Sequence, residues 1–512
     1  MRTVLPLLLL GACRGALPPG DPTTPDLVLV SIDTLRADHL SSYGCARPTS
    51  PFLDRLAAAG VRWSQARSPS PWTLPTHVTL LSGWLPTQHG VVEDDLAIPA
   101  EVPLLAEAMA ARGFATAGIV SSLYVSERYG FERGFETFDA FGIRTSQENL
   151  SGQVTATDVV DRALAWLRSL PRGKPAFLFV HFYDAHYPYA PPKPFSTLFD
   201  RAPRKRDAHY RRYAWYREHP LDPEQMAHQE AQYDEAIRYV DSELERLHGA
   251  LTAAGRPATW AVTADHGEEF GERGSWGHAH TLYPEQLHVP LILSGARIPA
   301  GESVDRVVGL QDLPGGLAVL SGADMPTWSR LSLDDSALRS GPQPSETSRF
   351  DSNRVGLWSD GWRLDLDLDS GTRELYDTTT DPGELHDRAA SEPERVADME
   401  RDLWGGRAAP WTCRDACTVQ ARRGLLVVGE AVRGREALLA PGEPFQVVPS
   451  DAEVRIAGEG RWYRAGVHPP PPDAALILRA DLHGRAVDLD PQERARLETL
   501  GYMQPEDEEP VP

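Results

Sequence analysis

Short apolar stretches alternate with amphipathic ones over most of the chain. Leu27–Asp33 and Thr259–Glu268 each begin with a largely apolar run and end in acidic residues, and Phe177–Phe182 is a third apolar run. Runs without strict alternation are typical of parallel strands that are buried on both faces. Ala115–Ser121 and His288–Leu293 have the same character. The pattern predicts a sheet whose strands lie in the core.

Amphipathic segments separate these runs, with their apolar residues at helical spacing. We expect helices at Thr49–Gly60, Val102–Gly113, Thr155–Leu170, Gln229–Leu251 and Gln311–Leu320. This alternation predicts an α/β fold in which a large mixed, mostly parallel sheet lies between two layers of helices. In such folds ligands bind at the carboxyl ends of the strands.

The pattern changes in the last third of the chain. Val355–Leu368 alternates apolar and polar residues, as antiparallel strands do. Three short segments predict a small β-rich module, namely Leu425–Val428, Phe445–Val448 and Ala475–Arg479. Leu489–Tyr502 is expected to be a helix, and the acidic, proline-rich end to be disordered. We therefore expect a main domain at 26–325, a small sheet-and-helix subdomain at 345–405 and the β-rich module at 410–512.

Residues 1–13 are predicted to be an export signal. They contain one arginine and an apolar core that is too short to span a bilayer and ends at Leu10-Gly11-Ala12-Cys13. This ending resembles the lipobox of bacterial lipoproteins, in which Cys13 would be the lipidated first residue; an ordinary signal peptide is the alternative. Residues 14–25 would be a linker. We expect an exported, periplasmic or cell-surface lipoprotein, attached to the membrane by its lipid anchor.

Composition limits the partners and the cysteine chemistry. The 73 acidic residues outnumber the 51 basic ones, so the formal net charge is −22. A chain this acidic repels nucleic acid, which we exclude as a partner. An anionic substrate would need positive charge from a metal and a few placed side chains.

The remaining cysteines carry little signal. Cys45 is expected to be buried. Cys413 and Cys417 are close enough in sequence to form a disulfide, or they are neighbours by coincidence.

Pro71–Gly83 carries the clearest chemical signal. Pro75 and Gly83 are placed as at the start and end of a helix, so Thr73 lies at or just before the helix N-terminus. A threonine there is either an ordinary cap or a nucleophile whose alkoxide the helix dipole favours. Asp33 and the pair Asp265-His266 follow two of the predicted strands. Three segment ends thus bring Asp33, Thr73, Asp265 and His266 to one place.

Six motifs bear on identity: I-D-T-L-R-A-D-H-L (Ile32–Leu40), T-L-P-T-H-V-T-L-L-S-G (Thr73–Gly83), H-F-Y-D-A-H-Y-P-Y (His181–Tyr189), T-A-D-H-G-E (Thr263–Glu268), W-G-H-A-H-T-L-Y (Trp276–Tyr283) and E-L-Y-D-T-T-T-D-P-G-E (Glu374–Glu384). In this order they resemble the sulfatase family of the alkaline phosphatase superfamily. The resemblance extends over roughly residues 26–390. It implies an alkaline phosphatase-like fold and an enzyme that acts on phosphoric or sulfuric esters.

The resemblance also implies a site. One divalent cation (calcium, magnesium, manganese or zinc) would be held by Asp33, Thr73, Asp265 and His266. His186 would contact the transferring group or its leaving oxygen. Related sulfatases have a lysine near the position of His278 and His280 that binds the ester oxygens. By this resemblance, the two histidines would stabilise charge or protonate the leaving group. Alternatively, these three histidines and Asp184 bind a second metal. Thr34 stands where many members have a second acid.

The motif at Thr73 departs from the family pattern. Sulfatases have a cysteine or serine there, which is oxidised to formylglycine, and an arginine where this chain has His77. Threonine carries a methyl group on Cβ and cannot form that aldehyde, whereas phosphodiesterases and phosphoglycerol transferases of the superfamily use threonine directly as nucleophile. We therefore predict hydrolysis or transfer of a phosphate mono- or diester by Thr73, with His77 among the residues that bind the ester. The alternatives are sulfate-ester hydrolysis without formylglycine and a surface binding protein without turnover.

The substrate is expected to be an anionic ester, such as a lipid headgroup or a glycan. Residues 188–230 form a polar insertion with seven basic residues between Arg201 and Arg217, interleaved with aromatic residues. This cluster is either a cover over the site that holds an anion or an ordinary solvated face.

Overall fold

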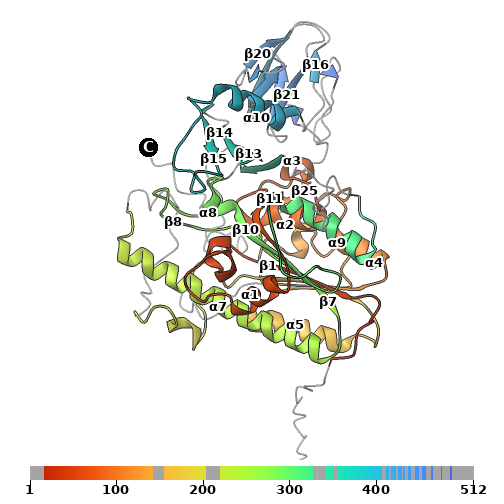
Figure 1. The fold of residues 1–512 in the computed structure, drawn as a ribbon. Helices are drawn as coiled ribbons and strands as arrows, with labels where there is room; N and C mark the ends of the chain where they lie inside the picture. The colour runs from red at the N-terminus through yellow and green to blue at the C-terminus, as the bar shows by residue number, and fades with distance from the viewer. Residues whose placement is uncertain are drawn as a thin grey trace, which may run out of the picture.

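A computed structural model describes residues 17–141, 155–202, 219–326 and most of 331–405 (Figure 1). Beyond residue 405 it describes only the backbone of short strands between residues 411 and 486. The predicted signal peptide with Cys13, the basic residues between 203 and 218, the helix at Leu489–Tyr502 and the terminal tail lie outside the described residues. The proposed domain boundaries stay predictions.

The main sheet has eight strands in the order β11-β2-β10-β7-β1-β6-β4-β5. The strands are β1 (Asp26–Ile32), β2 (Gly60–Arg67), β4 (Ala115–Val120), β5 (Thr137–Ala140), β6 (Ala176–Phe182), β7 (Ala258–Ala264), β10 (His288–Gly295) and β11 (Glu302–Gly309). Strands β7, β1, β6, β4 and β5 run parallel, and β10 is antiparallel to both of its neighbours. Every residue of β1 and β6 is buried, which confirms the prediction of a mixed, mostly parallel sheet in the core.

Helices cover both faces of this sheet (Figure 1). They are α1 (Pro51–Ala58), α2 (Thr73–Ser82), α4 (Leu105–Ala111), α5 (Ala156–Ser169), α7 (Pro223–Ala253) and α9 (Leu313–Ser321). Two single-turn helices are α3 (Pro86–His89) and α8 (Pro284–Leu287). Helix α7 contacts α1 and α5 in one layer, and α9 contacts α2 and α4 in the other. Helix α7 starts earlier than predicted, because Asp222 and Gln225 form a reciprocal cap ahead of the apolar periodicity.

A second sheet is antiparallel, as the alternation at Val355–Leu368 predicts. Its strands follow in chain order as β12 (Gln343–Thr347), β13 (Arg354–Ser359), β14 (Trp362–Asp367) and β15 (Arg373–Asp377). Helix α10 (Pro393–Gly405) packs on it through a separate small core that includes Leu364, Leu375 and Leu403. This core buries apolar residues of the sheet against the helix.

The remaining elements are short. Two of the predicted strands of the β-rich module are found, at β18 (Leu425–Val428) and β21 (Pro444–Val448), and β24 (Ala474–Ala475) overlaps the third at its first residue. The other strands are β3 (Leu96–Ala97), β8 (Glu269–Phe270), β9 (Trp276–Gly277), β16 (Trp411–Cys413), β17 (Cys417–Arg422), β19 (Ala431–Val432), β20 (Glu436–Leu439), β22 (Glu453–Ile456), β23 (Tyr463–Arg464) and β25 (Arg485–Ala486).

Cys45 was expected to be buried, but it is partly exposed, because it follows the surface turn at Gly44. Within the described ranges, no helix combines the length and apolar character needed to cross a bilayer.

Candidate active site

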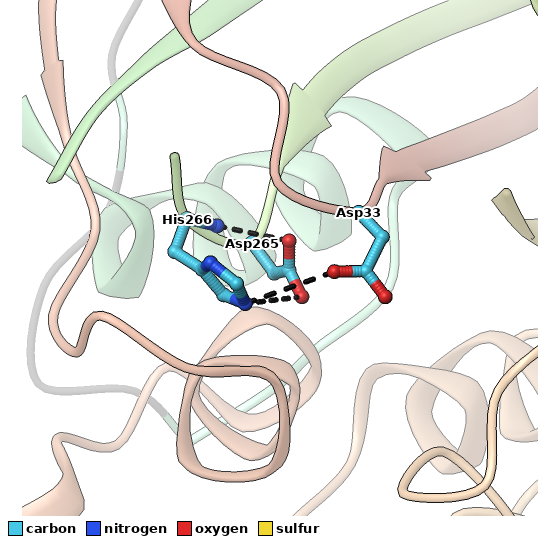
Figure 2. A group of neighbouring side chains, drawn as sticks. All are labelled: Asp33, Asp265 and His266. Atoms are coloured by element: carbon cyan, nitrogen blue, oxygen red, sulfur yellow. Dashed lines mark hydrogen bonds and ion pairs between the residues drawn. The ribbon is translucent and has the colours of Figure 1, made fainter. Parts of the chain in front are cut away.

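Two strand ends place acidic residues side by side. Strands β1 and β7 are parallel neighbours with Ile32 opposite Ala264, so Asp33 and Asp265 follow at the same level of the sheet. His266 Nε2 lies 3.7 Å from Asp33 Oδ1 and 3.4 Å from Asp265 Oδ2 (Figure 2). All three side chains are fully buried. The parallel register therefore brings together groups that are far apart in the sequence.

Thr73 joins this group from a third element. It is the first residue of α2, and its Oγ1 lies 3.2 Å from His266 Nε2. The residue before it, Trp72, is the extended N-cap residue, and no side chain caps the helix. The Thr73 hydroxyl is therefore directed at the acidic group instead of capping its own helix.

Hydrogen bonds set the protonation of His266. Its Nδ1 lies 3.0 Å from the carbonyl oxygen of Gly267, so Nδ1–H donates there and the Nε2 lone pair faces Thr73 and the two carboxylates. Burial and the neighbouring His278 lower the pKa of His266 well below its usual value, so the ring is neutral. A neutral ring whose Nε2 lone pair faces this group is suited to bind a metal and brings no positive charge of its own.

The two carboxylates lack a compensating charge from the histidines around them. Burial, and then the charge of Asp33, raise the pKa of Asp265 well above its ordinary value. Asp265 Oδ2 is buried and has no hydrogen-bond partner within the described part of the chain. Its ion-pair partners are His266 and His77, and burial lowers the pKa of both rings. Ligand atoms of Asp33, Asp265 and His266 lie within 4.8 Å of one another, so these residues fit a divalent cation.

His77 faces the scaffold with both ring nitrogens. Its Nδ1–H donates to the Thr73 carbonyl oxygen (2.8 Å), and its Nε2 accepts from the Ser31 hydroxyl (3.0 Å). The ring thus ties the first turn of α2 to strand β1. His181 packs against this ring at a centroid distance of 4.7 Å, and its Nε2 lies 3.6 Å from Asp33 Oδ2. Sequence reasoning left Ser31 and His181 out of the site, although both lie near the end of a predicted strand.

His186 and His278 lie beside His266. The His278 ring centroid is 4.4 Å from that of His266 and 5.1 Å from that of His186. Glu268 holds His278 through a 2.9 Å contact with its Nδ1, and also accepts a bond from the Tyr189 hydroxyl. Burial raises the pKa of Glu268 to about 7. His186, His278 and His266 thus form one cluster of rings, and the Thr73 hydroxyl lies at its His266 end.

His280 points away from that cluster. Its Nε2 lies 3.1 Å from Glu269 Oε2 and 3.0 Å from Ser275 Oγ, while its Nδ1–H donates to the carbonyl oxygen of His278. Between the two histidines, Ala279 has a positive φ of 74°, which turns the chain so that the rings face opposite sides. The sequence predicted both histidines for the site, and the structure brings only His278 to it.

Asp184 and Thr34 serve local structure. Asp184 accepts from the backbone N–H (2.9 Å) and the hydroxyl (2.7 Å) of Thr155, at the start of α5. Thr34 donates its hydroxyl to the Ala185 carbonyl oxygen (2.8 Å). Across the described residues, the group of Asp33, Asp265 and His266 is the one spaced to hold a metal. The alternative of a second metal bound by Asp184 and the histidines therefore has no geometric support there.

Known proteins resemble this chain over most of its length. A family model described as Sulfatase matches residues 25–323. Arylsulfatase K of Xenopus laevis is 23% identical over 417 residues, which cover 69% of this chain and 77% of the relative. The phosphonate monoester hydrolase of Agrobacterium radiobacter has a similar fold, with a TM-score of 0.61, 18% identity, and coverage of 74% of this chain and 95% of that chain.

A second similar structure is a complex with its substrate, D-glucosamine-2-N,6-O-disulfate. Its TM-score is 0.59 at 16% identity, and the match covers 75% of this chain and 99% of that chain. The family and its neighbours support an enzyme that hydrolyses esters. Because the Sulfatase model spans more than half of the residues, the chain belongs to the sulfatase family.

Proposed function

We propose that this enzyme hydrolyses an anionic phosphate mono- or diester through a covalent intermediate on Thr73. The observation that carries the proposal is the position of the Thr73 hydroxyl, 3.2 Å from His266 Nε2 at the edge of the buried Asp33–Asp265 pair. Threonine cannot become formylglycine, so its own oxygen is the group available for attack. The fold and family alone would not favour phosphate over sulfate.

A divalent cation held by Asp33, Asp265, His266 and Thr73 would supply the positive charge that lowers the pKa of the hydroxyl and stabilises the ester oxygens. Calcium, magnesium, manganese and zinc all suit three oxygen ligands and one nitrogen. The residues fit such an ion because the carboxylates are buried among neutral imidazoles. Two buried carboxylates without a nearby positive charge would otherwise be costly.

Chain residues perform the two steps. Thr73 would lose its proton, through water, to one of the neutral imidazoles of His278 and His186, while a Thr73 Oγ–P bond forms and the bond from phosphorus to the alcohol oxygen breaks. These histidines lie beside His266, would bind the ester oxygens, and would pass the Thr73 proton on to the leaving alcohol. Water then attacks phosphorus and releases the Thr73 hydroxyl. His77 and His280 were predicted to bind the ester. Instead, His77 would position the first turn of α2, and His280 would position the segment that carries His278.

Hydrolysis of a sulfate ester is the second candidate. The names of the relatives favour it, since arylsulfatase K and the disulfate complex both concern sulfate esters. In this chain sulfate transfer would also require Thr73, because no formylglycine can form there. A lipid headgroup or a surface glycan fits the predicted export and lipid anchor at Cys13.

The test is an ester panel with purified protein. p-Nitrophenyl phosphate, bis-p-nitrophenyl phosphate, p-nitrophenyl phenylphosphonate and p-nitrophenyl sulfate would each be assayed with calcium, magnesium, manganese or zinc. We expect turnover of a phosphorus ester, loss of it in Thr73→Ala, and partial retention in the matched Thr73→Ser, which keeps a hydroxyl. Intact mass after a rapid quench would detect phosphorylated Thr73. A Thr73→Ala protein as active as the parent would refute the mechanism, and turnover of sulfate alone would favour the second candidate.

A further inference from the structure

The loop that carries the nucleophile rests on a strand of the second sheet. Residues 68–72 connect β2 to α2, and strand β12 runs beside them. The Ser345 hydroxyl donates to the Ser68 carbonyl oxygen (2.7 Å), and the Glu346 N–H donates to the Pro69 carbonyl oxygen (2.9 Å). Ser345 and Glu346 are both buried. The second sheet is thus hydrogen-bonded directly to the segment before Thr73.

The same strand also holds the segment that presents His278. The Thr347 hydroxyl donates to the Ala279 carbonyl oxygen (3.0 Å), while the Ala279 N–H donates to the Pro71 carbonyl oxygen (3.0 Å). The two halves of the candidate site are therefore joined to each other and to β12. Ala279 keeps its positive φ between these two bonds.

Arg349, just after β12, completes this contact by packing on Trp72. Its guanidinium carbon lies 4.1 Å from the centroid of the Trp72 ring. One terminal nitrogen donates to Asp94 Oδ1 (2.6 Å) and the other to the Tyr124 hydroxyl (3.0 Å). Tyr124 in turn packs edge-on against Trp72, with ring centroids 5.7 Å apart. The cation therefore has fixed partners on two sides and an aromatic face on a third.

Trp72 is the residue through which this packing reaches the nucleophile. It is the N-cap residue of α2, and the peptide bond that follows it leads to Thr73. No side chain caps this helix, so the direction of its first turn depends on the residues that hold Trp72 and His77. A displacement of about 1 Å at a reacting group can cost on the order of a hundredfold in rate.

We propose that Arg349 is a positioning residue, which fixes the Trp72 ring and thereby the placement of the Thr73 hydroxyl for the reaction. The inference rests on the proposed function in that Thr73 is the nucleophile. It assigns a role in the chemistry to the second sheet, beyond covering the main one. Arg349 acts through Trp72 and does not itself need to touch the ester.

A matched control is available in the same sheet. Arg354 on β13 is also largely buried and pairs with two acids, Asp365 (3.0 Å) and Glu374 (3.3 Å), but those partners belong to the second sheet. Arg349→Met removes a buried guanidinium from this subdomain, and Arg354→Met removes a partly buried one. Only the first removes a contact with the nucleophile loop.

The experiment measures kcat, KM and thermal stability of the full chain with the p-nitrophenyl ester that the parent hydrolyses. We expect Arg349→Met to lower kcat about tenfold or more with KM changed less than about twofold, and Arg349→Lys to recover part of kcat. Arg354→Met should lose comparable stability and keep kcat within about twofold. In Arg349→Ala, millimolar guanidinium should restore kcat in a saturable manner by binding between Trp72 and Asp94.

A second readout does not depend on turnover. Amide hydrogen exchange in the peptide spanning residues 68–78 should accelerate in Arg349→Met and remain at the parental rate in Arg354→Met. Parental kcat and exchange in Arg349→Met would overturn the proposal, as would equal losses of kcat in the two arginine variants. A rise in KM alone would also overturn it, because Arg349 would then bind the substrate. If Thr73→Ala stays active, the proposed function fails, while the exchange measurement still decides whether Arg349 holds the loop.

Discussion

Replacing Asp265 with asparagine tests two properties of the buried acidic pair. One is the mutual repulsion of the two carboxylates in the metal-free protein, and the other is their ability to bind a cation. The exchange keeps the shape of the side chain and the Oδ1 acceptor, which receives the N–H groups of Thr34 (3.2 Å) and His266 (2.9 Å). It changes Oδ2, which has no hydrogen-bond partner within the described residues, into an amide donor. In the metal-free protein, Asp265→Asn should therefore remove repulsion and break no hydrogen bond.

The magnitude follows from the spacing of the group. Ligand atoms of Asp33, Asp265 and His266 lie within 4.8 Å of one another. Two like charges at that separation repel by about 3 kcal/mol at an effective dielectric constant of about 20. The raised pKa of Asp265 lets this carboxyl bind a proton in the metal-free folded state, which already relieves part of the repulsion. We therefore expect Asp265→Asn to raise the free energy of unfolding of the metal-free protein by at most about 3 kcal/mol. It should also abolish the further stabilisation that a bound cation gives to the parent.

The assay is thermal and urea unfolding of both proteins after chelation, and again with each divalent metal. Asp241→Asn is the matched control, since Asp241 is also buried but accepts the N–H groups of Phe52 (3.0 Å) and Leu53 (2.8 Å) with its two oxygens. That variant should lose stability with and without metal, because one of its acceptors is removed.

Either of two results would contradict a repelling acidic pair that a cation joins. One is an Asp265→Asn protein that is less stable than the chelated parent. The other is an Asp265→Asn protein that metal stabilises as much as the parent. Either would mean that the two carboxylates are not a repelling pair that a cation joins.

Three further changes test the surroundings of the site. Ala279→Gly should relieve about 1 kcal/mol of backbone strain at φ 74°, which melting curves would show as a gain in stability. It should also lower kcat several-fold in kinetic assays, because the more flexible backbone holds His278 less firmly. Gly267→Ala should destabilise by about 3 kcal/mol in urea unfolding, since its Cβ would lie 2.1 Å from the Glu285 carbonyl oxygen. Burial raises the pKa of Asp184 in the folded state to about 6, so between about pH 4 and 6 the folded state binds a proton that the unfolded state has lost. The free energy of unfolding should therefore fall by about 2–3 kcal/mol as pH rises from about 4 to 6. Asp184→Asn should flatten that part of the pH–stability curve.

The sequence alone determined the frame of the protein. Largely apolar runs such as Leu27–Asp33 predict buried parallel strands, and parallel strands end at a common edge, so Asp33 and Asp265 were expected at the same edge of the sheet. That their strands are direct neighbours is seen only in the structure. Pro75 and Gly83 likewise mark the helix that starts at Thr73. These features depend on local periodicity and on strand polarity, which residues close in sequence encode.

Only the tertiary structure decided which histidines face the reactive group and what holds the nucleophile loop. His278 and His280 are two residues apart and equally suited by type, yet the positive φ at Ala279 turns one toward His266 and the other toward Glu269. The contact of Arg349 with Trp72 joins segments hundreds of residues apart. Such directions depend on packing partners that are distant in sequence, so no local pattern encodes them.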